Sequence, residues 1–313
     1  MPLAHETWLV HDNVPTDWSF VTEGATLALL AGAVLITLAV RLLQRVRPGV
    51  DVPVLARMAP FMPFAVRLHL ATSLIGLLSL GYYLSPAMDL KANVVGILLG
   101  AVMVIVAVLM VIGIEVRIAA WILVAAGPLG MLEFGVSPVL QRLDMLGLAG
   151  FLIFTGAGRW SAEYELGRAR DPSPEAVARA VWALRVAAGA ALVIVAFVEK
   201  LAQPRLALDF LHHYPQFNVA QGVGIHMSDL DFARVAGSVE VLFGLLVISG
   251  ALPQAVVVIA GIPFNATLWF FGNVELVGHL PIYGTMLVLL VYGSSPRYRP
   301  LVPRLWPFRL RGA

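Results

Sequence analysis

NVVGILLGAVMVIVAVLMVIGI, residues 93 to 114, carries no charged side chain. A helix needs about 20 consecutive apolar residues to cross the hydrocarbon core of a bilayer. Apolar runs of similar character recur along the whole chain. The expected spans cover residues 21–43, 61–84, 93–114, 116–132, 140–156, 181–197, 233–249, 254–272 and 279–292. The sequence therefore predicts an all-α integral membrane protein with about nine transmembrane helices.

The composition indicates the same class of protein. Hydrophobic residues make up 59% of the chain, charged residues only 13%, and the mean hydropathy is +0.86. A soluble globular chain carries roughly 25% charged residues. The partner that we expect is therefore the lipid bilayer, and we expect no nucleic acid, because the arginines lie at the ends of apolar runs. The chain has no cysteine, which excludes disulfides, thiolate metal sites and cysteine nucleophiles.

Basic residues fall unequally on the two sides that alternating spans create. One side has only Lys91, Arg142, Lys200, Arg205 and Arg234. The other side collects Arg41, Arg45, Arg47, Arg57, Arg67, Arg117, Arg159, Arg168, Arg170, Arg179, Arg185, Arg297, Arg299, Arg304, Arg309 and Arg311. Basic loops are retained in the cytoplasm during insertion. We therefore expect a protein of the bacterial inner membrane with its N-terminus outside and its C-terminus in the cytoplasm.

Two sets of four spans look like a parallel tandem repeat. Arg67 begins one set and Arg185 the other, and Pro128 and Pro263 lie in matching spans. An even number of spans in each set gives both the same orientation. The expected organisation is an outer N-terminal segment with an extra helix (1–45), a first four-helix repeat (57–157), a cytoplasmic linker (158–179), a second four-helix repeat (180–295) and a basic cytoplasmic tail (296–313).

Polar residues gather in the second repeat. Glu240 lies inside a span, where an ionisable group is costly and normally faces a protein or water-lined interior. The side chains expected to form an outward-facing pocket are Glu199, Glu240, Asn265, Glu275, His279 and Tyr283. A hydrogen-bond network that only packs the helices is the alternative reading. Arg185, at the inner end of its span, is either a topology anchor or a ligand contact.

The long segment 201–232 adds three more histidines on the expected outer side. Imidazoles suit zinc, copper or iron, so His212, His213 and His226 are candidate metal ligands. Their spacing matches no established metal motif. The chain also shows no motif for a flavin, a haem or an iron–sulfur centre.

Residues 180–295 resemble the DoxX-like membrane protein family. The resemblance rests on Arg185, Glu199-Lys200-Leu201, Ala236-Gly-Ser-Val-Glu240, Leu242-Phe-Gly-Leu-Leu246 and Gly278-His-Leu-Pro-Ile-Tyr-Gly284. That family is a four-helix membrane unit related to the small subunit of a thiosulfate:quinone oxidoreductase. The resemblance implies a quinone- or sulfur-linked redox role on the outer face. The first repeat is similar but lacks the polar residues and has Asp144 at the position of His279, which implies a structural partner.

Three functions remain open from the sequence. The first is a subunit of an electron-transfer system, with Glu240, His279 and Glu199 as catalytic residues and Asn265, Tyr283, Glu275 and Arg185 binding a quinone. Quinone chemistry moves protons with electrons, which a carboxylate and an imidazole serve. A periplasmic or membrane electron-transfer protein would then be the partner. The alternatives are a non-catalytic membrane anchor of a larger complex, and periplasmic metal-ion handling or transport.

Overall fold

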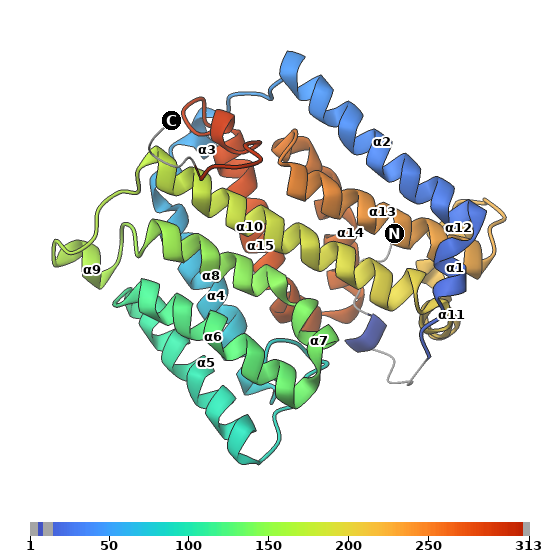
Figure 1. The fold of residues 1–313 in the computed structure, drawn as a ribbon, viewed down its shortest axis with the longest axis horizontal. Coiled ribbons are helices and arrows are strands. Elements are labelled where there is room, and N and C mark those ends of the chain that lie inside the picture. The colour runs from blue at the N-terminus through green and yellow to red at the C-terminus, as the bar shows by residue number, and fades with distance from the viewer. Residues whose placement is uncertain (1–5, 9–14, 309–313) are drawn as a thin grey trace.

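A computed structural model of the chain describes residues 6–8 and 15–308 (Figure 1). In this part of the chain there are helices and no strands. Eight helical stretches in it are long and apolar enough to cross a membrane. These are 24–46, 59–79, 94–112, 116–134, 174–201, 229–249, 253–271 and 275–293. The all-α membrane fold is confirmed, and the ninth expected span is a shorter apolar helix, Leu143–Thr155.

The long helices are joined by short helical pieces. The long ones are α2 (Gly24–Val46), α4 (Met62–Ser79), α5 (Val94–Ile112), α6 (Val116–Phe134), α8 (Leu143–Thr155), α10 (Pro174–Val195), α13 (Asp229–Ser249), α14 (Pro253–Phe271) and α15 (Asn273–Gly293). The short ones are η1 (Glu6–Trp8), α1 (Trp18–Thr22), α3 (Pro53–Ala56), η2 (Ala59–Phe61), α7 (Val136–Leu140), α9 (Ala162–Glu165), η3 (Ala196–Leu201), α11 (Pro204–His213), η4 (Pro215–Phe217), α12 (Val219–Gly222) and η5 (Arg299–Leu301).

The two halves share unusual backbone features at matching places. Helix α5 is followed by the C-cap residue Gly113 and α13 by Gly250, both with left-handed φ angles (73° and 64°). The following helices begin after Glu115 and Leu252, which also have positive φ (48° and 42°). A non-glycine residue there is uncommon and strained. These shared features are those expected of the predicted repeat.

The two halves pack on each other through two matching contacts, in each of which the first helix of one half lies against the last helix of the other. Helix α10 lies against α8, and α15 lies against α4, while α2 packs on α13 (Figure 1). Within the second half, α10 and α13 approach closely because Gly189 and Gly244 face each other. A Cβ atom on Gly189 would come within 2.5 Å of the carbonyl oxygen of Gly244. Small residues allow such approaches between membrane helices.

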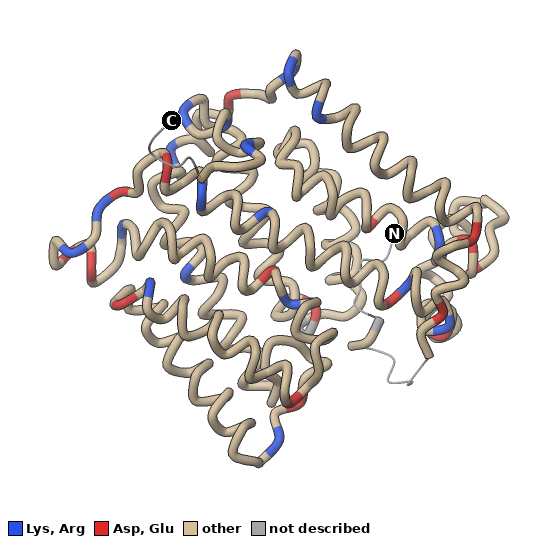
Figure 2. The backbone as a smooth tube through the Cα atoms, in the orientation of Figure 1, with Lys and Arg blue, Asp and Glu red and all other residues tan. Residues whose placement is uncertain are grey.

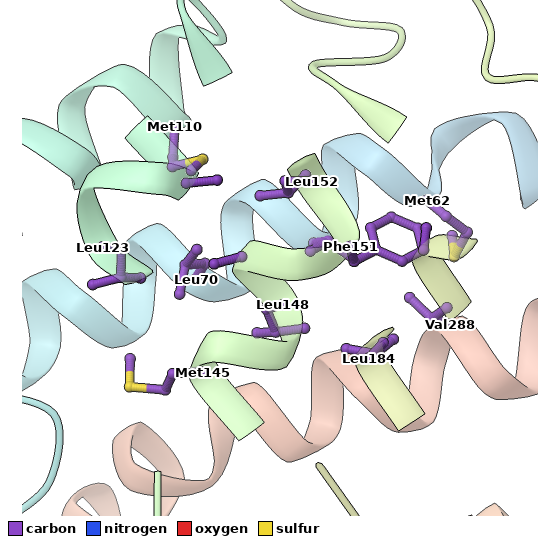
Figure 3. Close-up of a cluster of buried hydrophobic side chains, with 14 of the residues drawn as sticks. Met62, Leu70, Met110, Leu123, Met145, Leu148, Phe151, Leu152, Leu184 and Val288 are labelled. Carbon is purple, nitrogen blue, oxygen red and sulfur yellow. The ribbon is translucent and has the colours of Figure 1, made fainter. Parts of the chain in front are cut away.

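The core of the bundle surrounds α8. Leu148, Phe151 and Leu152 of α8 are fully buried and meet Leu70 of α4 and Leu184 of α10 (Figure 3). The outer helices bury much less. Only 17% of the apolar 18-residue stretch of α2 and 22% of that of α14 are buried inside the molecule. Their exposed apolar faces are suited to lipid.

The two ends of the bundle differ in charge. We call the end formed by loops 47–52, 113–115, 156–173 and 294–308 the C-terminal side, and the opposite end, with η1, α11 and α12, the α11 side. Most Lys and Arg residues lie on the C-terminal side (Figure 2). There the buried Arg67 donates to the carbonyl oxygens of Met110, Ala157 and Trp160 at 2.6–3.1 Å. Arg67 thus ties the end of α5 to the following loops.

Candidate functional site

A buried polar cluster lies where α10, α13 and α15 approach the α11 side. Helix α10 passes into a π-helical turn, η3, at Ala196–Leu201. Turns of this kind interrupt the α-helical ladder and often occur at functional sites. The turn carries Glu199 and Lys200, whose exposed fractions are 0% and 1%. The turn thus carries two charged side chains that lie inside the bundle.

Lys200 forms an ion pair with Glu240 of α13. The Lys200 Nζ and Glu240 Oε1 atoms are 3.1 Å apart, and the two side chains are 1% and 2% exposed. Glu240 lies eleven residues after Asp229, the first residue of α13. At about 1.5 Å per residue this is about 16 Å along the helix, close to half the thickness of a hydrocarbon core. The pair is therefore deep in the membrane-spanning region.

A second acidic group pairs with an imidazole on α15. Glu275 and His279 are one turn apart, and Glu275 Oε2 lies 2.7 Å from His279 Nδ1. Both side chains are buried. The imidazole ring lies between two aromatic rings, with centroids 5.3 Å from Trp8 and 5.1 Å from Phe264. A carboxylate on Nδ1 fixes the orientation of the ring and directs Nε2 away from Glu275.

The first half of the chain supplies a third pair. Arg142 and Asp144 lie at the break between α7 and α8, with Arg142 Nη2 3.3 Å from Asp144 Oδ2. The same nitrogen donates to the carbonyl oxygen of Gly278 on α15 at 2.8 Å. The guanidinium, 1% exposed, thus links the two halves beside His279.

A small cavity is bordered by one member of each of the three pairs, namely Asp144, Glu240 and His279. Its volume is about 20 Å³, which is room for one water molecule. The polar part of its wall is formed by Gln141, Asp144, Glu240 and His279. The apolar part comes from Ala191, Leu192, Val195, Phe264 and Ile282. A water held by such a wall can pass a proton between carboxyl groups and an imidazole.

Residues near the N-terminus cover this region. Thr7 Oγ1 donates to Glu199 Oε1 at 2.7 Å. Trp8 is 7% exposed and lies under the guanidinium of Arg142, whose Cζ is 5.7 Å from the centre of the indole. A three-residue 3₁₀ turn therefore contacts both halves of the chain at the site.

Four of the six predicted pocket residues come together as expected. Glu199, Glu240, Glu275 and His279 are all buried in this cluster. Tyr283 lies one turn further along α15, half-buried, with its ring centre 6.5 Å from that of Phe264. Its hydroxyl is buried and has no hydrogen-bond partner among the described residues. Tyr283 is not among the residues that line the cavity.

Two predicted site residues lie elsewhere. Asn265 is exposed on α14 and donates to the carbonyl oxygen of Gly261 in its own helix. The prediction that Asn265 lines the pocket is wrong, because the side of α14 that faces the cavity carries Phe264. Arg185 lies at the C-terminal side and donates to the carbonyl oxygen of Arg304. It is a helix-end contact, and the prediction that it binds a ligand in this pocket is wrong.

The three candidate metal ligands do not converge. His212, His213 and His226 are exposed, and the rings of the first two stand at 85° with centres 5.8 Å apart. His213 Nδ1 contacts the carbonyl oxygen of Asp209 in its own helix. In residues 6–8 and 15–308 no three His, Asp or Glu side chains are grouped so that they could hold a metal ion. The prediction of a metal site at these histidines is therefore wrong.

The sequence alone missed the contribution of the first half. Asp144 was expected to be structural, yet it lines the cavity with Gln141. Two signals were present: Asp144 matches His279 in the repeat, and Arg142 is one of few basic residues on its side. Trp8 has no such signal, because its place depends on how the chain folds back before α2.

Comparison of the chain with known protein families, with curated proteins and with solved structures found no match. The resemblance to the DoxX-like family stays a prediction. The function is therefore argued from the geometry of the site.

Proposed function

We propose that this protein is the membrane subunit of a quinone- or sulfur-linked redox system of the DoxX-like kind, in which the buried cluster exchanges protons with a bound quinone. One observation carries the proposal: Asp144, Glu240 and His279 converge on a water-sized cavity deep in a membrane-spanning bundle. Ionisable groups are costly there and normally serve ions, protons or ligands.

The residues have distinct roles in this proposal. Glu275 holds His279 through Nδ1, so the imidazole can accept a proton or donate one at Nε2. Glu240 faces the same cavity and shares its charge with Lys200. A water in the cavity connects the two groups and carries a proton between them. Glu199, held by Thr7, extends the acidic path toward the α11 side.

A bound quinone supplies two-electron, two-proton chemistry. Arg142 and His279, which lie beside the cavity, are the groups that would hold its oxygens. The electrons require a partner electron-transfer protein in the membrane or the periplasm. The excess of basic residues on the C-terminal side supports an orientation with that side in the cytoplasm of a bacterial inner membrane.

The test is the quinone content of protein purified in mild detergent, measured by mass spectrometry of the extract. Wild type should hold about one quinone per chain, as expected for one site. His279→Gln should lose it, because Gln cannot replace the imidazole paired with Glu275. Asp231→Asn is the matched control, since Asp231 is exposed on α13, the helix of Glu240, and pairs with Arg234 instead.

Absence of quinone from wild type and variants alike would overturn the proposal. Equal quinone in wild type and His279→Gln would also overturn it, because binding would then lie elsewhere. A non-catalytic anchor is the second candidate, favoured by the exposed apolar residues Val223 (73%) and Ile225 (55%) near α12. Under that function, polar substitutions at these two residues would release a co-purifying protein while His279→Gln would not.

A further inference from the structure

A second, wider cavity lies at the C-terminal side, where the loop after η5 passes the start of α10 (Figure 1). Its volume is about 940 Å³, which is within the range of about 300–1,000 Å³ typical of small-molecule sites. Glu175 and Arg179 of α10 form one wall, and Arg304, Leu305 and Trp306 of the loop form the other. Unlike the water-sized cavity of the buried cluster, this one has room for a ligand.

The loop that forms the second wall is fixed through its backbone. Arg185 of α10 donates to the carbonyl oxygen of Arg304. Trp182, also of α10, donates from Nε1 to the next carbonyl oxygen, that of Leu305, at 2.7 Å. These hydrogen bonds use main-chain atoms of the loop, and the side chain of Arg304 is exposed at the cavity. The cavity is therefore built by side chains of α10 that hold the loop in place.

Positive charge exceeds negative charge around this cavity. Arg179 and Arg304 line it, together with a single carboxylate, that of the exposed Glu175. The guanidinium of Arg185, which holds the loop, is 1% exposed, and its Nε and Nη1 atoms have no hydrogen-bond partner among the described residues. Within residues 6–8 and 15–308, no Asp or Glu forms an ion pair with any of these three arginines.

Other arginines of the same side are neutralised by carboxylates. Arg159 pairs with Asp171, and Arg168 pairs with Glu115. The arginines at the cavity differ because they have no such partner in the described part of the chain. A guanidinium binds phosphate oxygens through two parallel hydrogen bonds. The cavity thus has the charge and the donors that a phosphate group requires.

The surroundings of the cavity favour lipid over a dissolved ion. Leu305 and Trp306 are 60% and 67% exposed, and the ring of Trp306 meets that of Trp182 edge-on at 5.6 Å between centroids. Tryptophan is enriched at the level of the lipid headgroups. The helical stretch 174–201 has 28 residues, so it is about 42 Å long and exceeds the hydrocarbon core by about 12 Å. The start of α10 therefore lies among the headgroups.

We propose that this cavity binds the headgroup phosphate of an anionic phospholipid, with Arg179 and Arg304 on the phosphate and with Leu305 and Trp306 against the apolar part of the lipid. Basic pockets at the ends of transmembrane helices bind such headgroups. The inference assigns one site to one class of lipid, beyond the general contact of the bundle with a bilayer. It does not rest on the proposed function, because the buried cluster lies at the opposite end of α10.

The experiment measures binding of dioleoyl phosphatidylglycerol to the full chain in nonionic detergent by native mass spectrometry. Wild type should bind this lipid more tightly than the zwitterionic dioleoyl phosphatidylcholine. Arg179→Gln and Arg304→Gln should each weaken binding about fivefold and together about 25-fold, the equivalent of about 1 kcal/mol per basic side chain. The matched control, Arg45→Gln with Arg297→Gln, removes two charges from exposed arginines that do not line the cavity, and it should bind as wild type does.

Glu175→Gln tests the site through a gain of binding. It removes the one carboxylate that lines the cavity, so phosphatidylglycerol should bind up to about fivefold more tightly, the same effect per charge. A damaged fold would only weaken binding. Equal or weaker binding by Glu175→Gln would overturn the inference, because the phosphate would then lie away from the start of α10.

Three other results would also overturn it. Equal binding of the two lipids by wild type would show that the anion is not recognised. Equal weakening by the Arg179, Arg304 pair and by the control pair would show only a general attraction to a basic surface. Glycerol 3-phosphate that binds wild type as tightly as phosphatidylglycerol does would identify the ligand as a free phosphate ester and not as a lipid.

Discussion

Replacing Lys200 by methionine should destabilise the protein by about 3–5 kcal/mol, the usual cost of breaking a buried ion pair. The structure supports this size. Lys200 Nζ and Glu240 Oε1 are 3.1 Å apart, and the side chains are 1% and 2% exposed. At that distance and an effective dielectric constant of about 20, the attraction is about 5 kcal/mol. Without Lys200, the carboxylate of Glu240 remains buried but has lost the positive charge that offsets the cost of its desolvation.

The double variant Lys200→Met, Glu240→Leu separates charge from packing. Replacing both partners by apolar residues of similar volume is often nearly neutral. We expect it to be more stable than Lys200→Met alone by about 2–4 kcal/mol, since neither charge is then stranded. Lys91→Met is the matched control, because Lys91 pairs with Glu133 at 3.5 Å but is 64% exposed. It should cost less than about 1 kcal/mol.

The assay is reversible unfolding in mixed detergent micelles, followed by tryptophan fluorescence. The reasoning is refuted if Lys200→Met costs no more than Lys91→Met. It is also refuted if the double variant is less stable than Lys200→Met alone and than Glu240→Leu alone. The two side chains would then contribute to stability independently of each other.

Three further predictions concern the bundle and its loops. Gly189→Val should prevent stable folding, because a Cβ there would lie 2.5 Å from a carbonyl oxygen of α13. The same unfolding assay should then show no cooperative transition. The control Gly32→Ala has open space around it and should be neutral or slightly stabilising. Arg67→Lys should lower the free energy of unfolding by about 2–4 kcal/mol, since a lysine cannot reach three carbonyl oxygens at once; an unchanged value would contradict this. The hydrogen bond from Arg159 holds the pKa of Asp171 below its ordinary value of 3.8. The stabilisation from this pair is therefore complete above that value and lost as the pH falls through the lower folded-state pKa, and Asp171→Asn should remove this part of the acid dependence of unfolding.

The fold was largely predictable because a membrane-spanning helix can be recognised from a run of about 20 apolar residues. The uncharged run at 93–114 became α5, Val94–Ile112. The expected span at 140–156 became a break at Gln141 and Arg142 followed by the short α8. Polar residues within an apolar run are readily assigned to an interior, but the sequence does not say whether they interrupt the helix.

The site was predictable only where both residues of a contact lie on the same helix, because helical periodicity then fixes their separation. Glu275 and His279 are one turn apart, so their contact follows from helical periodicity. Asn265 has a similar depth to Glu240, yet its side chain is exposed because the rotation of α14 is set by packing against α15. The contacts of Trp8 and Arg142 with α15 join residues more than 130 positions apart. No local pattern encodes such contacts.

Proton exchange at Glu240 is the central claim, and infrared difference spectroscopy during reduction of a bound quinone tests it most directly. In wild type, reduction should change the absorption band of a protonated carboxyl group. The band change should disappear in Glu240→Gln and remain in Asp231→Asn, whose carboxyl group lies outside the cavity. Identical difference spectra for wild type and Glu240→Gln, or no carboxyl band in wild type, would contradict the claim.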